Sequence, residues 1–154
     1  MKMDKYYIPL LIDAVKEASE AILNIYNSNF DVEIKPDNSP VTLADKTSSK
    51  ILVRYLKETN IPIISEEEEK LAYSKRKQLE KLWLVDPIDG TKEFVKRSGQ
   101  FCICIALVEL GKPIFGMIVD PINQLVLFGG KDLGAYCAPL TSENVMAKKY
   151  RVVQ

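Results

Sequence analysis

Three apolar segments in the second half of the chain follow one another so closely that they can pair only as neighbouring antiparallel strands. They span residues 101–110, 113–120 and 124–129, and short runs of turn residues separate them. A parallel connection between strands needs a dozen or more residues, whereas an antiparallel hairpin needs only about two. The sequence therefore predicts an antiparallel meander, which a short piece at 135–138 would extend.

The first half of the chain is expected to provide two helices. Apolar residues recur at helical spacing from Asp4 to Asn27, which predicts one long amphipathic helix. Thr42 and Asp45 form the pattern of a capping box and predict the start of a second helix. Further short strands are expected at 31–35, 61–65 and 81–86. Two helices packed on an antiparallel β-sheet make an α+β fold.

Length and charge restrict the class of protein. The 154 residues suit a single domain with a real core. Lys plus Arg and Asp plus Glu number 21 each, so the charge gives no sign of a nucleic acid polymer as partner. Charged residues interrupt every apolar run, so no transmembrane segment is predicted, and the charged N-terminal residues are unlike a signal peptide. The sequence therefore predicts a cytoplasmic protein.

The chain has no histidine, and this narrows the chemistry that it can perform. Ser-His-Asp and Cys-His catalysis are excluded, as are histidine-ligated metals. Cys102 and Cys104 fall on one face of a predicted strand, and we interpret them as core-filling residues. A zinc site would need more cysteines or histidines than these. Any chemistry is therefore expected to use carboxylates, hydroxyls, lysines or metals bound by oxygen.

Carboxylates stand at the ends of three separate predicted elements. Asp45 lies in the first turn of the second helix, Glu66 and Glu67 follow a strand directly, and Asp86 and Asp89 flank a turn after the next strand. Neighbouring strand ends would gather these carboxylates, and unit charges 4 Å apart repel by about 4 kcal/mol near a protein surface. Divalent cations relieve that repulsion, and oxygen ligands favour Mg²⁺, Mn²⁺ or Ca²⁺. We therefore predict a metal site.

The turn after the third of these strands suits such a site. Pro87 fixes φ, Gly90 permits backbone angles closed to other residues, and the bend is expected to expose the carbonyl of Ile88. Thr91 adds a hydroxyl that could hold a water nucleophile for in-line phosphoryl transfer. Simpler interpretations remain open: a structural turn, an acidic helix N-terminus after Ser65, and a purely capping role for the acid at the start of the second helix.

Three segments, Thr42–Asp45, Ser65–Glu67 and Trp83–Thr91, together resemble the inositol monophosphatase superfamily of lithium-sensitive, Mg²⁺-dependent phosphatases. The order and spacing of the three match, and the resemblance covers residues 6–138. Residues 37–42 and 89–94 look most like the 3′(2′),5′-bisphosphate nucleotidase branch, the CysQ type. The resemblance implies hydrolysis of 3′-phosphoadenosine 5′-phosphate, a by-product of sulfate assimilation, to AMP and phosphate. Inositol-1-phosphate phosphatase activity is the alternative within the family.

The resemblance also implies roles for individual residues. Two or three Mg²⁺ ions, replaceable by Mn²⁺, would be held by Glu66, Asp86, the carbonyl of Ile88, and Asp89. Catalysis, through activation of a water, would involve Asp45, Glu66 and Thr91. The phosphate of a small nucleoside bisphosphate substrate would contact Glu66, Ile88, Asp89, Gly90 and Thr91.

The sequence departs from the superfamily after Ala138, where nothing matches its second α/β domain or the Trp-Asp motif of that domain. We expect a metal-binding domain at 1–140, a short tail at 141–154 that could form a helix, and no C-terminal domain. One ion would then lack a protein ligand, and the exposed sheet face would be a candidate homodimer surface. A truncated domain that binds Mg²⁺ without turnover is therefore an alternative.

A phosphatase of the haloacid-dehalogenase kind is a further alternative, because its Asp-x-Asp-Gly-Thr loop looks similar. That chemistry needs two aspartates spaced two residues apart, whereas Asp86 and Asp89 are spaced three apart. It also needs a parallel Rossmann-like sheet, which the predicted meander contradicts.

Overall fold

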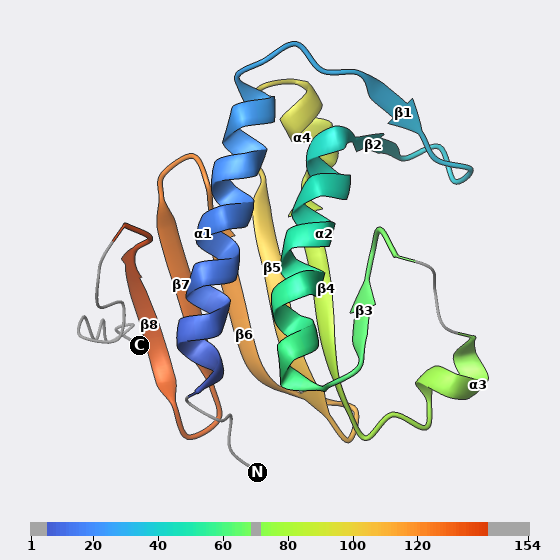
Figure 1. Cartoon of the computed structure of the whole chain (residues 1–154), viewed down its shortest axis with the longest axis vertical. Coiled ribbons are helices and arrows are strands. Elements are labelled where there is room, and N and C mark those ends of the chain that lie inside the picture. Colours follow the sequence, from blue (N-terminus) through green and yellow to red (C-terminus); the bar gives the residue numbers. More distant parts are fainter. Residues whose placement is uncertain (1–5, 69–71, 142–154) are drawn as a thin grey trace.

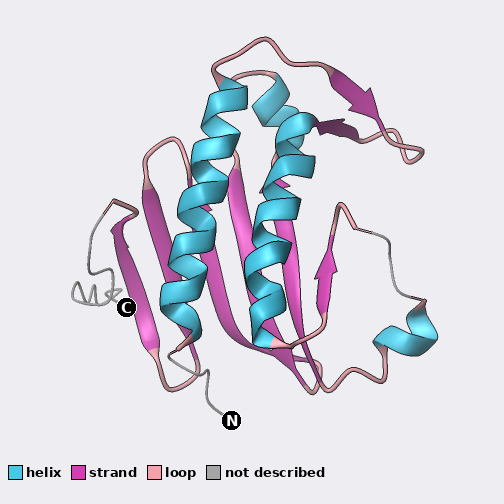
Figure 2. Ribbon diagram, in the orientation of Figure 1, coloured by secondary structure: helices cyan, strands magenta, loops and turns pink. Residues whose placement is uncertain are grey.

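The computed structural model describes residues 6–68 and 72–141, which form two layers, with a pair of helices lying across one face of a six-stranded sheet (Figures 1 and 2). The expected helix within 142–154 lies outside the described residues. The main elements are α1 (Tyr7–Tyr26), α2 (Leu43–Leu56), β3 (Ile63–Ser65), β4 (Lys81–Asp89), β5 (Cys102–Glu109), β6 (Lys112–Asp120), β7 (Leu125–Gly130) and β8 (Gly134–Pro139). Smaller elements are β1 (Val32–Ile34), β2 (Pro40–Thr42), η1 (Lys57–Thr59), α3 (Tyr73–Arg76) and α4 (Thr91–Val95). The predicted α+β class is confirmed.

The sheet has the strand order β3-β4-β5-β6-β7-β8, and each neighbour in the run from β4 to β8 is antiparallel. This is the meander that the short turns predict. The edge strand β3 is the exception, because it runs parallel to β4. The residues between β3 and β4 are numerous enough for such a connection.

The structure corrects several local predictions. The predicted strand at 81–86 extends to Asp89, because its pairing with β5 continues across a register shift between Asp86 and Asp89. Pro40–Thr42 pairs with β1 in a small hairpin, although the residues around Pro40 are typical of a loop. The short helices α3 and α4 were also missed, since four or five residues are too few to show a helical period.

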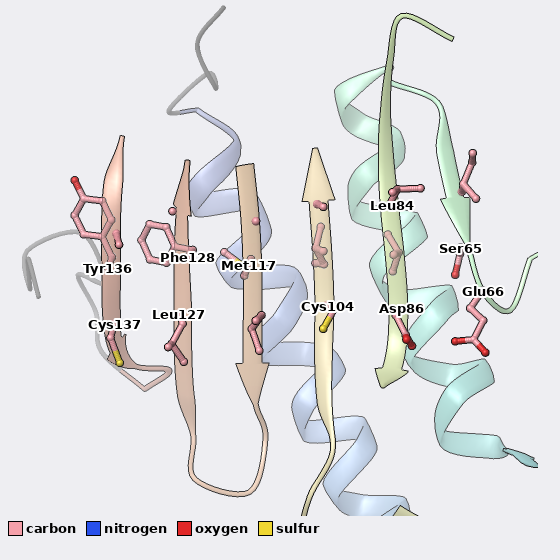
Figure 3. Close-up of a pocket in the computed structure, with 18 of the residues that line it drawn as sticks. Ser65, Glu66, Leu84, Asp86, Cys104, Met117, Leu127, Phe128, Tyr136 and Cys137 are labelled. Atoms are coloured by element: carbon pink, nitrogen blue, oxygen red, sulfur yellow. The ribbon is translucent and has the colours of Figure 1, made fainter. Parts of the chain in front are cut away.

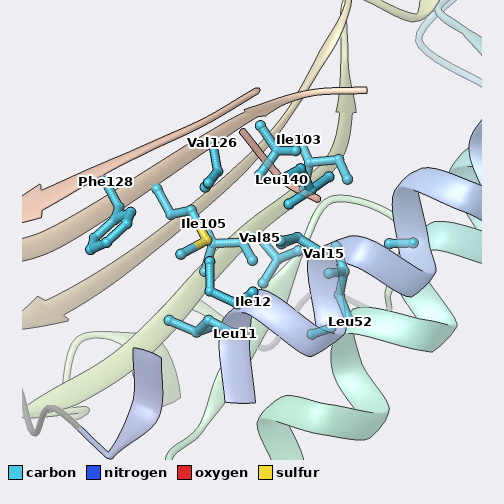
Figure 4. Close-up of a cluster of buried hydrophobic side chains, with 14 of the residues drawn as sticks. Leu11, Ile12, Val15, Leu52, Val85, Ile103, Ile105, Val126, Phe128 and Leu140 are labelled. Carbon is cyan, nitrogen blue, oxygen red and sulfur yellow. The ribbon is translucent and has the colours of Figure 1, made fainter. Parts of the chain in front are cut away.

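The core lies between the two helices and the covered face of the sheet. Leu11 and Val15 of α1 and Leu52 of α2 are buried against Ile103 and Ile105 of β5 (Figure 4). Each such side chain contributes about 1.5–3 kcal/mol when fully buried. The alternation of buried and half-buried positions along β5 shows that only one side of this strand faces the helices.

The opposite side of the sheet, which we call the uncovered face, carries Leu84, Ile118 and Leu127 with 41%, 50% and 44% of their surfaces exposed. Cys102 and Cys104 point to this face, since the intervening Ile103 is buried beneath the helices. The interpretation of the two cysteines as core-filling residues is therefore wrong, because the strand turns them away from the core. Among the described residues, no helix combines the length and apolarity needed to cross a lipid bilayer.

Candidate active site

The first turn of α2 fixes the carboxylate of Asp45. Its Oδ2 accepts hydrogen bonds from the backbone N–H of Thr42 at 2.8 Å and from the Thr42 hydroxyl at 2.6 Å, which completes the predicted capping box. Its Oδ1 accepts a hydrogen bond from the Thr91 hydroxyl at 2.8 Å. Asp45 is only 1% exposed, and hydrogen bonds to both of its carboxylate oxygens fix the position of the side chain. Capping and contact with the acidic turn are therefore two roles of one residue rather than alternatives.

A β-bulge in β4 places two predicted acidic residues on the same side of the sheet. Asp86 lies opposite Cys104 and Asp89 lies opposite Cys102, so three steps along β4 correspond to two along β5. In a regular strand, residues three apart face opposite sides. The extra residue of the bulge restores Asp89 to the side of Asp86 and leaves Ile88 buried.

The chain reverses at Gly90, where φ is 95°. A Cβ at this position would lie 2.8 Å from the carbonyl oxygen of Gln100, so both the angle and the space require glycine. The Thr91 hydroxyl lies 3.2 Å from the carbonyl oxygen of Ile88 and close to Asp45, and it has one proton to donate between them. The carbonyl of Ile88 is therefore directed to the same side as this hydroxyl.

The surroundings of Asp86 disfavour its charged form. Its Oδ1 is buried without a hydrogen-bond partner. Burial, followed by the charges of Glu66 and Asp89, raises the pKa of Asp86 from 3.8 to about 7. A buried anion with two like-charged neighbours is costly unless a positive charge compensates it. The unpartnered oxygen and the purely oxygen donor set fit a hard divalent cation.

A hollow of about 210 Å³ brings the predicted residues together. Its lining includes Glu66, Asp86, Ile88, Asp89, Gly90 and Thr91. Asp45 is not part of the lining, and it reaches the hollow through the Thr91 hydroxyl. The oxygens of Glu66, Asp86 and Asp89 are not all within 4.8 Å of one another, so a cation shared by all three would require these side chains to move closer together.

The parallel pairing of β3 with β4 delivers Glu66 to this hollow. Ser65 lies opposite Val85, and the backbone N–H of Glu66 donates to the Val85 carbonyl at 3.1 Å. Parallel neighbours end at the same edge of a sheet, so Glu66 and Asp86 emerge side by side (Figure 3). An antiparallel pair would have placed these two carboxylates at opposite ends.

Lys35 from the β1–β2 hairpin was not anticipated at the site. Its Nζ lies 2.5 Å from a carboxylate oxygen of Glu67 and 3.3 Å from one of Glu66. Glu67 does not line the hollow; its carboxylate pairs with this lysine. The lone lysine in a turn-rich region carried no sequence signal that pointed to an acidic partner 31 and 32 residues away.

Two serines of α2, which the sequence did not predict at the site, hold the strands that carry it. The hydroxyl of Ser48 donates to the Pro87 carbonyl at 3.1 Å, and Ser49 shares a hydrogen bond of 3.0 Å with Ser65. They follow Asp45 by three and four residues and therefore share its side of the helix. That spacing was the signal that could have identified them. Through these contacts α2 holds the ends of both β3 and β4.

The sequence of the chain is similar to that of known proteins. The model of the inositol monophosphatase family matches residues 3–152. The chain is 38% identical over 120 residues to the 3′(2′),5′-bisphosphate nucleotidase CysQ of Salmonella typhimurium and 40% identical over 115 residues to that of Escherichia coli K12. These alignments cover 75% and 72% of this chain and 48% and 46% of the relatives, so the chain spans about half of their length.

Solved structures show the same fold. CysQ from Bacteroides thetaiotaomicron matches with a TM-score of 0.73 and 41% identity, over 84% of this chain and 48% of that one. The extragenic suppressor protein SuhB from Bartonella henselae matches with a TM-score of 0.76 and 26% identity, over 86% of this chain and 52% of that one. The sequence match, the shared fold and the conjunction of Asp45, Glu66 and the 86–91 turn agree: the chain belongs to the inositol monophosphatase family.

Proposed function

We propose that this chain provides the metal-binding and water-activating part of a phosphomonoesterase of the 3′(2′),5′-bisphosphate nucleotidase type, which converts 3′-phosphoadenosine 5′-phosphate to AMP and phosphate. The observation that carries the proposal is the buried, unpartnered Oδ1 of Asp86 in a hollow lined by Glu66, Asp89 and the Ile88 region. The substrate class comes from the names of the relatives that are 38% and 40% identical.

Metal binding is assigned to Glu66, Asp86, the carbonyl of Ile88, and Asp89, for two or three Mg²⁺ ions with Mn²⁺ as a substitute. When bound, such ions lower the pKa of a coordinated water and offset the charge of phosphate oxygens. The phosphate is assigned to the same hollow, next to Glu66 and the residues from Ile88 to Thr91, all of which line it.

Asp45 and Thr91 are proposed to accept the proton of the attacking water. When the Thr91 hydroxyl donates its one proton to Asp45 at 2.8 Å rather than to the Ile88 carbonyl at 3.2 Å, its oxygen lone pairs remain free to accept a hydrogen bond from water. That acceptance orients the water lone pair toward phosphorus, and the proton can pass through the hydroxyl to Asp45. Glu66 supports the step by accepting a second hydrogen bond from the water.

We further propose that residues 1–140 act as one domain in the cytoplasm. One continuous cluster of buried apolar residues joins α1, α2 and the sheet, which supports a single domain. Cys102, Cys104 and Cys137 are free thiols, which are typical of a reducing compartment. The exposed leucines and isoleucine of the uncovered face support a homodimer formed through that face.

A phosphate-release assay tests the catalytic proposal. The purified chain would be incubated with Mg²⁺ and either 3′-phosphoadenosine 5′-phosphate, inositol 1-phosphate or fructose 1,6-bisphosphate. We expect the nucleotide to be hydrolysed fastest, Asp89→Asn to abolish turnover, and the exposed helix variant Asp13→Asn to retain it. Preference for inositol 1-phosphate would overturn the substrate assignment. Bound Mg²⁺ without turnover would instead support a non-catalytic metal-binding domain.

The haloacid-dehalogenase alternative is not retained. The sheet is antiparallel at every pair except β3–β4, and the chain belongs to another family. Covalent phosphorylation of Asp86 or Asp89 is therefore not part of the proposal.

A further inference from the structure

Two thiols lie beside the acidic hollow and are not used by the proposed reaction. Cys102 and Cys104 project from β5 onto the uncovered face, and their Sγ atoms are 3.7 Å apart. The bulge in β4 sets Asp89 directly opposite Cys102. One carboxylate oxygen of Asp89 and the two sulfurs all lie within 4.8 Å of one another. Two soft ligands and one carboxylate thus converge on a single point.

The spacing of the sulfurs matches that of two thiolates on one metal ion. A Zn–S bond of about 2.3 Å and a tetrahedral angle place two sulfur ligands about 3.8 Å apart. A disulfide would instead require the sulfurs to close to about 2.05 Å. The observed 3.7 Å between the two sulfurs of β5 is therefore the distance expected of two ligands of one metal ion.

We propose that Cys102, Cys104 and Asp89 form a binding site for a thiophilic divalent cation, such as Zn²⁺ or Cd²⁺, with the fourth position open to water. The absence of histidine and the small number of cysteines argued against a zinc site from sequence alone. The structure changes this conclusion, because the cross-strand neighbour Asp89 supplies a third ligand that no Cys-x-Cys spacing reveals.

An ion can reach the site from solvent. Asp89 is exposed at the end of strand β4, and Cys104 lines a broad hollow of about 840 Å³ over the uncovered face. Thiolates select soft ions over Mg²⁺, which prefers oxygen ligands. The thiol site and the proposed Mg²⁺ site are therefore adjacent sites that prefer different ions.

The two sites share Asp89, so a soft ion should displace Mg²⁺ and inhibit the enzyme. Binding to the thiols does not depend on the proposed function, whereas this competition does. A soft-metal site of this kind would make the hydrolase sensitive to zinc or cadmium at the residue that it needs for magnesium.

Cadmium titration of the full chain tests the proposal, read by the ultraviolet charge-transfer absorption of cadmium thiolates. We expect one equivalent to bind to the unmodified protein and to Cys137→Ser, which removes the third thiol of the uncovered face. Cys102→Ser and Cys104→Ser should each lose most of the absorption, and Asp89→Asn should weaken binding. Equal absorption in all four variants, or its loss only in Cys137→Ser, would overturn the site.

Alkylation of the unmodified protein gives a second readout that needs no variant. One equivalent of Cd²⁺ should protect Cys102 and Cys104 from a thiol reagent while Cys137 remains reactive, as located by mass spectrometry of peptides. Uniform protection or uniform reactivity would refute the assignment. Excess Mg²⁺ should weaken cadmium binding; unchanged cadmium affinity would contradict the shared role of Asp89 and the proposed Mg²⁺ site, while leaving the thiol site intact.

Discussion

At the scale of single residues, the site depends on a carboxylate whose surroundings oppose its charge. Asp86 is half-buried, lacks a hydrogen-bond partner at Oδ1 and faces the charges of Glu66 and Asp89. Either protonation of this carboxylate or a bound cation would remove the unfavourable charge. The same residue therefore links stability, pH and metal binding.

Thermal unfolding at pH 5 and pH 8 tests this link. The pKa of Asp86 is about 7 in the folded chain against 3.8 ordinarily, so its stabilising contribution is complete below about pH 4 and is lost as pH rises through 7. In the absence of Mg²⁺, Asp86→Asn should raise the melting temperature at pH 8 more than at pH 5. Added Mg²⁺ should stabilise the unmodified protein at pH 8 and not the variant. A Tm difference between the two proteins that is independent of pH would contradict the assigned pKa.

Gly90 carries the second prediction at this scale. Gly90→Ala combines a positive φ of 95° with a Cβ contact of 2.8 Å to backbone, and we expect it to lower the free energy of unfolding by about 2–4 kcal/mol. Gly111→Ala is the matched control, with φ of 74° and nothing near the added Cβ, and should cost about 1–2 kcal/mol. Urea denaturation measures both. Equal losses would show that the close approach of Gln100 to Gly90 is not maintained.

At the scale of elements, helix α2 acts as the support that holds the acidic turn. Its first turn fixes Asp45, and Ser48 one turn later donates to the Pro87 carbonyl inside the turn. Because this hydrogen bond is buried, loss of the Ser48 hydroxyl would remove a partner of the Pro87 carbonyl that water does not readily replace.

Serine-to-alanine substitutions at two buried helix positions distinguish the contribution of this hydrogen bond from the higher helix propensity of alanine. Ser48→Ala should destabilise the protein by about 1–2 kcal/mol and weaken Mg²⁺ binding, since the turn loses its anchor. Ser19→Ala in α1 should be neutral or stabilising, because the Ser19 hydroxyl is buried without a partner. Equal effects on unfolding free energy would indicate that the bond to Pro87 contributes nothing.

The elements also show which parts of the fold the sequence could predict. The long helices and the meander carry repeated periodic signals, and both were expected within a few residues of their observed ends. The parallel β3 could not be inferred from Ile63–Ser65, because a three-residue strand carries no information about its direction. The bulge between Asp86 and Asp89 was equally hidden, since it depends on the register with β5.

Some residues of the candidate site are likewise predictable from the sequence, and others are not. The sequence predicts Glu66, Asp86, Asp89 and Thr91 because they stand at element ends next to turn residues, and all four line one hollow in the structure. Lys35 and the thiol pair were not assigned to it, because their relation to the acids arises only from tertiary contacts. A residue whose role depends on a cross-strand or long-range partner gives no local pattern.

At the scale of the whole molecule, the helices pack on one side of the sheet, and among residues 6–68 and 72–141 the other side carries exposed apolar side chains. Leu84, Ile118 and Leu127 lie on that uncovered face. Leu127→Lys should shift the proposed homodimer to monomer in analytical ultracentrifugation, because a buried lysine would be costly at the interface. Leu110→Lys, at an exposed turn, should leave the association unchanged. Identical sedimentation of both variants and the unmodified chain would contradict pairing through this face.

The central claim is that the end of this sheet binds a divalent cation through Asp86 and its neighbours. Calorimetric titration of the purified chain with Mg²⁺ at pH 8 tests it most directly. We expect saturable binding that is abolished in Asp86→Asn and in Asp89→Asn and is retained in Asp13→Asn. Absence of binding to the unmodified chain, or undiminished binding in Asp86→Asn, would contradict the account.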